Sequence, residues 1–323
     1  MKTSELMKRF VPYYGKYWRV MVFDLFCASL TTICELVLPM ILRFITNEGM
    51  RDLASITSGM IIRIALVYFG LRIIDGMAAF YMAYTGHVMG ARIETDMRQD
   101  AFEHLQKLSD SYFNNTKVGQ IMARITSDLF DVTEFAHHCP EEFFIAGIKT
   151  IVSFAVLAGI NLPLTVIIFA FIPVMAVSCT YFNLKGRAAF KRQRYQIGEL
   201  NAKIEDNLLG NRVVRAFANQ DIEIEKFRED NQAFLDIKRE TYKYMAAFQN
   251  TVRMFDGLMY TVVILAGGIC MVKGLISPGD LVAYTMYVTT LLATIRRIIE
   301  FAEQFQRGMT GIERFVEIMD STV

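Results

Sequence analysis

The residues of this sequence most able to do chemistry are charged side chains inside long apolar stretches. Glu35 lies in CASLTTICELVLPM and has no oppositely charged residue within a helical turn. Arg72 and Asp75, and likewise Arg253 and Asp256, stand three residues apart, a spacing that suits ion pairs along one helix face. Because ionisable groups are costly in a bilayer, they usually mark function, here binding of a cation or coupling of protons. We expect Arg72 with Asp75, and Arg253 with Asp256, to form ion pairs that fix helix packing. For Glu35, a functional role and a packing role both stay open.

A second group of candidates could line a cavity for amphipathic molecules. The chain holds 19 methionines and 25 phenylalanines, side chains that suit adaptable binding surfaces but equally suit a helical core. Arg296 and Arg297, near Glu300 and Glu303, could contact such a cavity or reach lipid headgroups. The residues that we single out for a substrate cavity are Glu35, Phe255, Met259, Met286, Tyr287 and Arg296.

The run His137-His138-Cys139 invites a metal-site interpretation. Adjacent residues on a helix point about 100° apart, so by themselves they chelate poorly. We therefore expect ordinary packing ahead of Pro140, with no metal, no catalytic residue and no cofactor in this chain. The cysteines number five and have no metal-clip spacing, which indicates small buried hydrophobic residues rather than disulfides.

The composition indicates an all-α integral membrane protein. Of 323 residues, 53% are hydrophobic and 21% are charged, so the charges must be segregated from the apolar segments. The net charge of +1 gives the chain no overall basic field that would indicate nucleic-acid binding. Residues 150–184 contain no ionisable side chain and are too long for one span of roughly 20 residues. Asn161-Leu162-Pro163 supplies a turn between two spans.

Six spans account for the apolar segments. We expect an interfacial amphipathic helix over residues 1–18, a six-helix domain over 19–320, and the start of a linker at 321–323. Most Lys and Arg residues lie in 1–19, 92–131, 185–243 and 296–323, which places both termini in the cytoplasm of a multi-pass cell-membrane protein. The spans are expected near residues 19–46, 57–108, 126–160, 163–209, 221–273 and 278–319.

Several of these helices are too long for the membrane alone. A proline-free helix over residues 60–108 would run ~70 Å at 1.5 Å per residue, against ~30 Å of hydrocarbon. Two such extensions end in short capped segments, SDSYFNNTKVGQIMARITSD (109–128) and GNRVVRAFANQDIEIEKF (210–227). Apolar residues held away from the bilayer favour docking of a cytosolic partner. The alternative is that Val213, Val214 and Phe217 pack on their own bundle.

Four motifs in register resemble the exporter-type ABC transporters of the six-span, type IV class. GQIMARITSD (119–128) is similar to their first intracellular loop and NRVVRAFANQDIEIEKF (211–227) to their second. GLISPGDLVAYTMYVTTLL (274–292) resembles the start of their sixth span, and GIERFVEIMD (311–320) their closing segment. The match covers essentially the whole chain. It suggests a transmembrane domain like that of multidrug or lipid exporters.

The resemblance implies two six-helix units that pair and exchange their fourth and fifth spans. It also implies two short coupling helices that seat in clefts of nucleotide-binding domains. The first is carried onto Ser111, Tyr112, Phe113, Asn114 and Asn115. The second is carried onto Arg212, Val213, Val214, Arg215, Ala216, Phe217 and Ala218.

Two departures from the family pattern stand out. No G-x-x-x-x-G-K-[ST] motif, the phosphate-binding loop of many ATPases, is present. We therefore expect ATP and Mg²⁺ to bind a nucleotide-binding domain that this chain lacks. That domain is either removed by truncation, which we favour, or a separate chain. Thr294 stands where many relatives carry a proline before the paired basic residues, which leaves a kink there in doubt.

The implied function is the translocation pathway of an ATP-driven exporter that alternates between inward-facing and outward-facing states. The implied partners are a second transmembrane domain, identical or different, two nucleotide-binding domains, the lipid bilayer and an amphipathic small-molecule or lipid substrate. One alternative is an ATP-independent channel or ion-coupled carrier, which would favour broken helices and shorter cytosolic loops. Another is an uptake system on the same fold.

Overall fold

The computed structural model describes residues 3–116 and 118–322, and every regular element in these residues is helical. The chain divides into two compact units, which are described separately. Residues 1–167 and 262–323 form the first, called the bundle. Residues 168–261 form the second, called the long hairpin. Of the predicted interfacial helix and linker, residues 1–2 and 323 lie outside the described residues.

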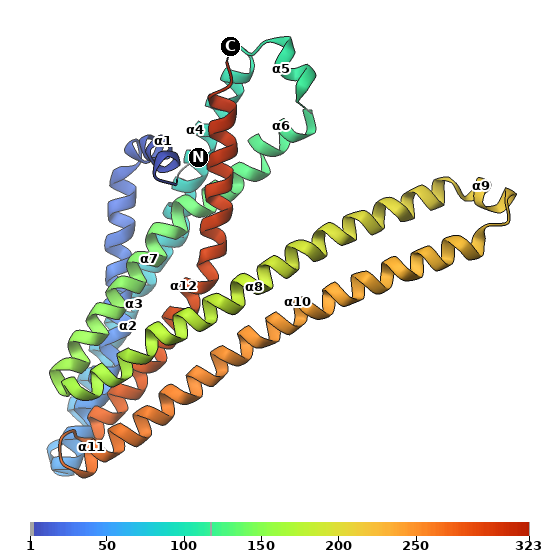
Figure 1. Ribbon diagram of the computed structural model, residues 1–323. Coiled ribbons are helices and arrows are strands. Elements are labelled where there is room, and N and C mark those ends of the chain that lie inside the picture. Colours follow the sequence, from blue (N-terminus) through green and yellow to red (C-terminus); the bar gives the residue numbers. More distant parts are fainter. Residues whose placement is uncertain (1–2, 117, 323) are drawn as a thin grey trace. The chain divides into compact units, whose positions relative to one another are not determined.

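Nine helices and three short helical turns lie in the described part of the bundle (Figure 1). A one-turn 3₁₀ segment lies at Leu53–Ser55, and π-helical turns lie at Met82–Gly86 (η2) and Val263–Gly267 (η3), before the short helix α11 at Gly268–Val272. The main helices are α1 (Thr3–Gly15), α2 (Trp18–Arg51), α3 (Ser58–Tyr81), α4 (His87–Leu105), α5 (Asp110–Asn115), α6 (Val118–Ile125), α7 (Ser127–Ile160) and α12 (Pro278–Met319).

Local chemistry sets where these helices end. Between α7 and the next helix, α8 (Leu162–Leu209), Asn161 adopts an extended backbone, and its Oδ1 accepts a hydrogen bond from the Leu164 amide at 3.0 Å. At the start of α12, Ser277 and Asp280 form a capping box around Pro278, which satisfies amide groups that the first turn leaves open. The turn predicted at Asn161 is confirmed.

The bundle is organised around α7, which contacts α2, α4, α6 and α12. Close approach to α12 depends on two glycines: a Cβ on Gly308 would overlap the Phe135 side chain, and one on Gly311 would lie 2.5 Å from the Asp128 carbonyl oxygen. Small residues at helix crossings permit such backbone proximity in membrane proteins. The core that results contains buried Ile93 from α4 and Phe315 from α12.

Helix α1 is anchored in this core. Leu6 and Phe10 are buried in it, and the Tyr14 hydroxyl donates a hydrogen bond to the Ala136 carbonyl oxygen of α7 at 2.5 Å. Burial raises the pKa of Tyr14 above its ordinary value, so the hydroxyl remains a neutral donor. Charged Glu5, Lys8 and Arg9 of the same helix are exposed. The helix therefore has a buried apolar side and an exposed polar side.

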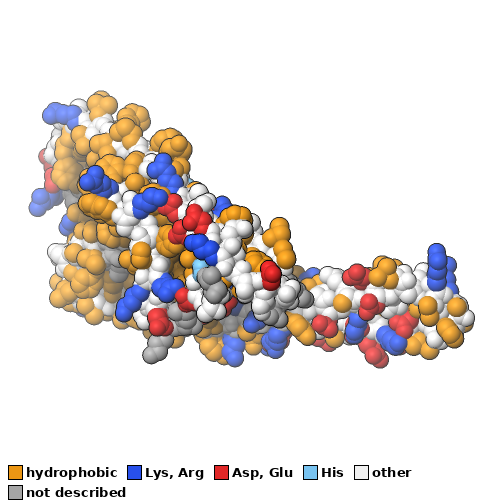
Figure 2. Space-filling view, turned by 90° about the horizontal axis from the view of Figure 1, so that it is seen from above, with side chains coloured by type: hydrophobic (Ala, Val, Ile, Leu, Met, Phe, Trp, Pro, Cys, Tyr) orange, Lys and Arg blue, Asp and Glu red, His pale blue; other side chains and the backbone are white. Residues whose placement is uncertain are grey.

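The long hairpin consists of the greater part of α8, the short helix α9 (Asn211–Ala216) and α10 (Gln220–Val262), with α8 and α10 antiparallel and α9 joining them (Figure 1). Charges of both signs lie among hydrophobic side chains along it (Figure 2). Two ion pairs connect the helices: Arg192 Nη2 lies 2.7 Å from Glu240 Oε1, and Lys203 Nζ lies 2.6 Å from Asp230 Oδ2. Leu200 of α8 is buried.

By length and composition, four stretches of the described residues could cross a membrane: Trp18–Arg51, Val118–Ile160, Leu162–Leu209 and Gln220–Val272. The other two expected spans, around α3 and α12, are helical but are not among these four. Several membrane-spanning helices are thus present. All five cysteines are free and four are buried, which confirms the prediction for them.

Candidate functional site

The predicted second tip is the turn of the long hairpin. Helix α9 covers residues 211–216 and ends in Phe217, followed by Ala218 at φ 54°. The Asn219 amide donates to the Val214 carbonyl at 3.0 Å and the Ala218 amide to the Arg215 carbonyl at 3.2 Å. This is the Schellman pattern that stops a helix with a left-handed residue, most often glycine. The sharp stop fixes the direction of the chain as it enters α10.

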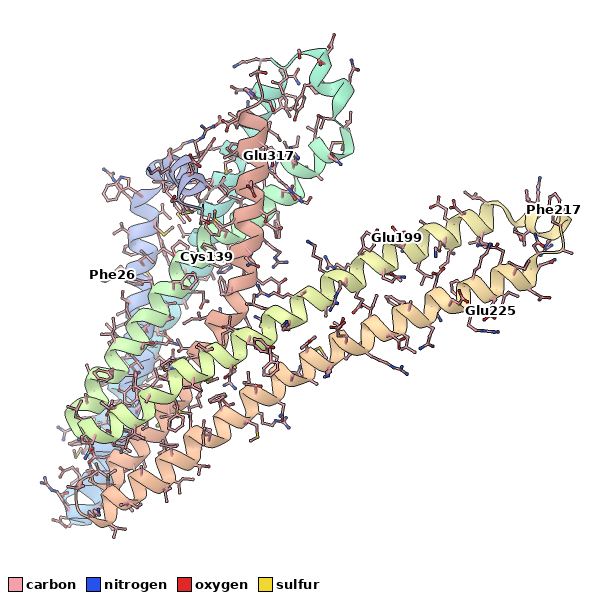
Figure 3. The ribbon with its side chains drawn as sticks, in the orientation of Figure 1. Phe26, Cys139, Glu199, Phe217, Glu225 and Glu317 are labelled. Atoms are coloured by element: carbon pink, nitrogen blue, oxygen red, sulfur yellow. The ribbon has the colours of Figure 1, made fainter. Side chains whose placement is uncertain are left out.

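Apolar side chains on this tip face solvent. Phe217 is 72% exposed and lies at the far end of the hairpin (Figure 3). Val213 is 60% exposed, Leu209 is 79% exposed and Val214 is partly buried. Arg212, Arg215, Ala216 and Ala218 are also exposed. The structure does not support the alternative that Phe217 packs on its own helices, because most of its side chain is exposed.

A groove lies directly behind this tip, between α8 and α10. Its volume is about 670 Å³, and its lining combines apolar Ile204, Leu208, Ile224 and Phe227 with charged residues. Asn207 Nδ2 donates to Glu223 Oε2 at 2.9 Å across the hairpin. The tip and groove therefore form a continuous, partly apolar surface that the long hairpin leaves uncovered.

The predicted first tip belongs to the bundle and is more closely packed. Helix α5 carries Ser111, Tyr112, Phe113, Asn114 and Asn115; of Asn115 only the helical backbone is described. Tyr112 packs on a small core of Leu105, Leu108, Ile121 and Ile318. The Phe113 ring meets the Tyr112 ring edge-on at 5.5 Å and is 39% exposed. The α5 tip thus presents a smaller apolar surface than the α9 tip.

The bundle also contains a polar cavity of about 320 Å³ between α7 and α12. Its lining includes Glu142, Lys149, Thr294 and Arg297. Arg297 pairs with Glu142. Lys149 Nζ lies 2.7 Å from Glu35 Oε2, so Glu35 does have a partner, which α7 supplies rather than its own helix. The structure thus favours ion pairing for Glu35.

The other predicted cavity residues divide by burial. Tyr287 is 1% exposed and its hydroxyl donates to the Leu36 carbonyl oxygen at 2.8 Å; Met259, in the long hairpin, is also 1% exposed. Phe255, Met286 and Arg296 are partly buried. In this conformation Tyr287 and Met259 act as packing residues, because they have almost no surface for another molecule to contact.

The ion pair predicted along α3 is confirmed, since Arg72 Nη1 lies 2.7 Å from Asp75 Oδ2. The histidines of α7 have a neighbour that the sequence analysis did not consider. His137 and His138 of α7 are joined by His87 of α4, with ring centroids 4.5–4.8 Å apart. Sequence reasoning missed this cluster because its third ring comes from a helix 50 residues earlier in the chain.

Comparison with known proteins agrees with this architecture. Residues 21–295 match the ABC transporter transmembrane region family. The uncharacterized ABC transporter ATP-binding protein YwjA of Bacillus subtilis is 32% identical over 318 residues, and YknU of the same organism, described in the same words, is 26% identical over 320. The ATP-dependent lipid A-core flippase of Thiobacillus denitrificans is 21% identical over 318 residues.

Each of these alignments covers 98% of this chain and 54% of the relative. The chain therefore spans about half the length of the curated relatives it matches. The family match covers most of the helical elements described above, including the long hairpin and both tips. The chain is a member of the ABC transporter transmembrane region family.

Proposed function

We propose that this chain is the transmembrane domain of an ATP-driven exporter, and that α5 and α9 are the helices through which it engages ATP-binding domains. The observation that carries the proposal is the α9 tip: a capped helix whose Phe217 is 72% exposed at the end of a long helical hairpin. A rigid pair of helices that ends in an exposed apolar side chain suits transmission of force from a docked partner.

The relatives support this function through their names. Several are called ABC transporter ATP-binding proteins, one is a putative multidrug export ATP-binding/permease protein of Bacillus subtilis, and others are ATP-dependent lipid A-core flippases. We extend from these names to an amphipathic small molecule or lipid as substrate. Two copies of the membrane domain, or two related chains, would enclose the pathway and pair with two ATP-binding domains carrying ATP and Mg²⁺.

The proposed topology has six membrane crossings and cytoplasmic termini. It takes α3 with α4, and α12, as crossings in addition to the four apolar stretches. With six crossings, the Lys- and Arg-rich segments 1–19, 92–131, 185–243 and 296–323 would share the cytoplasmic side, in accord with the positive-inside rule. Residues 1–18 would then lie along the cytoplasmic membrane surface.

Alternating access sets an energetic requirement. Reversing a two-state population almost completely takes about 5.5 kcal/mol of differential binding. We assign that energy to ATP binding by the partner domains, transmitted through the tips. Burying the exposed part of the Phe217 ring in a partner cleft would contribute about 1–2 kcal/mol, scaled from roughly 1.5–3 for complete burial of a phenylalanine.

The test compares Phe217→Ala with Phe190→Ala in the full transporter. Phe190 is a matched control because it is also an exposed phenylalanine of the long hairpin but lies on α8, away from the tip. Uptake of an amphipathic fluorescent dye and ATP hydrolysis are measured in inside-out vesicles. We expect transport per ATP to fall roughly tenfold in the Phe217 variant, from the loss of docking energy, and to be unchanged in the control.

Equal effects of the two substitutions would refute the proposed role of the tip. Retention of full coupled transport by Phe217→Ala would refute it as well. Protein amount and folding are followed in both variants by size-exclusion chromatography in detergent, so that loss of the protein is not read as loss of coupling.

A further inference from the structure

A cluster of metal-ligating side chains lies inside the bundle, where α2, α4 and α7 meet. Asp24 comes from α2, His87 is the first residue of α4, and His137, His138 and Glu141 come from α7. One donor atom each from Asp24, His137 and Glu141 lies within 4.8 Å of the other two. Figure 3 labels Cys139, the residue between the two α7 members of this trio.

These three residues are almost completely enclosed by protein. Asp24 is 0% exposed, His137 is 2% exposed and Glu141 is 8% exposed. Both carboxylate oxygens of Asp24, Nδ1 of His137 and Oε2 of Glu141 have no hydrogen-bond partner among the described residues. Buried polar groups in folded proteins nearly always have partners, so four such atoms in one small cluster indicate a missing ligand.

The cations nearest to these carboxylates have closer carboxylate partners. Arg297 interacts electrostatically with Glu141 but forms its ion pair with Glu142, and Lys149 pairs with Glu35. His137 lies close to both carboxylates, with Nδ1 3.9 Å from Asp24 Oδ2 and Nε2 3.5 Å from Glu141 Oε2. A single imidazolium cannot balance two buried carboxylates, and a divalent cation would balance both.

The backbone is shaped to admit the His137 ring. A Cβ on Gly86 would overlap this imidazole, and a Cβ on Gly90 would lie 3.0 Å from Thr133. Gly86 also ends the π-helical turn η2, directly before His87. Single π-turns inside long helices frequently occur at functional sites. Gly86 of η2 and Gly90 of α4, four residues apart, thus let α7 bring His137 and Thr133 close to this backbone.

We propose that Asp24, His137 and Glu141 bind a divalent transition-metal ion, with Zn²⁺ the best chemical match. Imidazole nitrogen with carboxylate oxygen is a ligand set that zinc accepts, whereas Mg²⁺ and Ca²⁺ prefer oxygen ligands alone. Three protein ligands leave a fourth position for water or for a neighbouring histidine. We expected no metal ligand in this chain because only the adjacent residues His137, His138 and Cys139 suggested a site. Asp24 lies on a different helix and was not part of that reasoning.

The donor atoms must move closer together to bind zinc. In a tetrahedral zinc site with bonds of about 2.0–2.2 Å, two donor atoms lie about 3.4 Å apart. The 3.9 Å between His137 Nδ1 and Asp24 Oδ2 requires a contraction of roughly half an ångström, and a pair at the outer limit of 4.8 Å for the trio requires one of roughly 1.4 Å. The bound ion would link α2 to α7.

The first measurement uses the unmodified full-length protein, purified in detergent after treatment with a chelator. Zn²⁺ is added and free metal removed, and bound zinc is measured by elemental analysis. Co²⁺ is then added in place of Zn²⁺ as a spectroscopic probe. We expect one zinc per chain. We also expect bound Co²⁺ to show the intense visible absorption of a four-coordinate ion with a nitrogen ligand. Absence of bound zinc, or only the weak spectrum of hydrated cobalt, would overturn the proposal.

Variants then assign the ligands. Asp24→Asn and Glu141→Gln keep the side-chain shapes, and we expect each to weaken zinc binding by at least about tenfold, with a larger loss for His137→Ala. His104→Ala is the matched control, because His104 is the one remaining histidine and instead contacts the Ser321 carbonyl oxygen at 3.0 Å. It should bind zinc as the unmodified protein does.

Two results of the variants would contradict this ligand set. If His87→Ala and His138→Ala abolish binding while Asp24→Asn does not, the ion belongs to the three histidines. If His104→Ala weakens binding as much as Asp24→Asn, the loss is not specific. The zinc-dependent rise in melting temperature provides a further readout, since a ligand that binds only the folded state must raise it. The rise is expected in the control and not in Asp24→Asn.

Discussion

Replacement of Gly311 by alanine tests the packing of α12 on α7. The added Cβ would lie 2.5 Å from the Asp128 carbonyl oxygen and 2.8 Å from Val132 Cγ2. The carbonyl belongs to the backbone of α7 and cannot rotate away, so the two helices must separate by several tenths of an ångström or more. That movement would loosen the core that contains Ile312 and Phe315.

The magnitude follows from two opposing effects. Overpacking of a well-filled core costs about 1–3 kcal/mol, while replacing a helical glycine with alanine gains about 1 kcal/mol. Because the contact is with a fixed backbone atom, we expect a net loss of about 1–2 kcal/mol in the free energy of unfolding. Gly147→Ala on α7 is the control: no atom lies within 4 Å of its Cβ position, so only the gain of about 0.5–1 kcal/mol remains.

Thermal unfolding in detergent measures the difference, with a thiol-reactive fluorogenic dye as reporter. The dye reports unfolding because Cys27, Cys34, Cys139 and Cys179 are buried in the folded chain. The two variants should differ by roughly 2 kcal/mol, with opposite signs relative to the unmodified protein. If Gly311→Ala were as stable as Gly147→Ala, the close α7–α12 contact would be wrong.

Three further substitutions test other contacts. Tyr284→Phe should destabilise the bundle by about 1–3 kcal/mol. The buried Tyr284 hydroxyl lies 2.8–2.9 Å from Thr165 Oγ1 and from two carbonyl oxygens at the α7–α8 turn. An unchanged melting curve would contradict a stabilising role for these hydrogen bonds. Lys149→Met should cost under about 1 kcal/mol, because its partner Glu35 is half exposed; a larger loss would mean that the pair is shielded. Gly86→Ala should displace the His137 ring and abolish zinc binding, and retained binding measured by elemental analysis would argue against the metal site.

The short-range features of the fold were predictable from the sequence. The turn at Asn161 and the helix at residues 211–216 follow from caps, proline and glycine, whose effects extend over only a few residues. The pairing of Arg72 with Asp75 was predictable for the same reason, because one helical turn brings them together.

Contacts between helices were not predictable in the same way. The partner of Glu35 is Lys149, and the buried cluster around His137 joins residues more than 100 positions apart in the chain. Each depends on how a helix is rotated about its axis, and an error of one residue turns a side chain by about 100°. Tyr287 illustrates the consequence, since its register on α12 points it at the Leu36 carbonyl rather than at open space.

The energy source of transport tests the central claim most directly. The full transporter is reconstituted in liposomes, and accumulation of an amphipathic dye is compared with ATP, with a non-hydrolysable ATP analogue, and with an imposed ion gradient alone. The exporter that we propose accumulates dye with ATP only. Dye accumulation that the ion gradient alone drives, and that ATP does not increase, would contradict the proposed function.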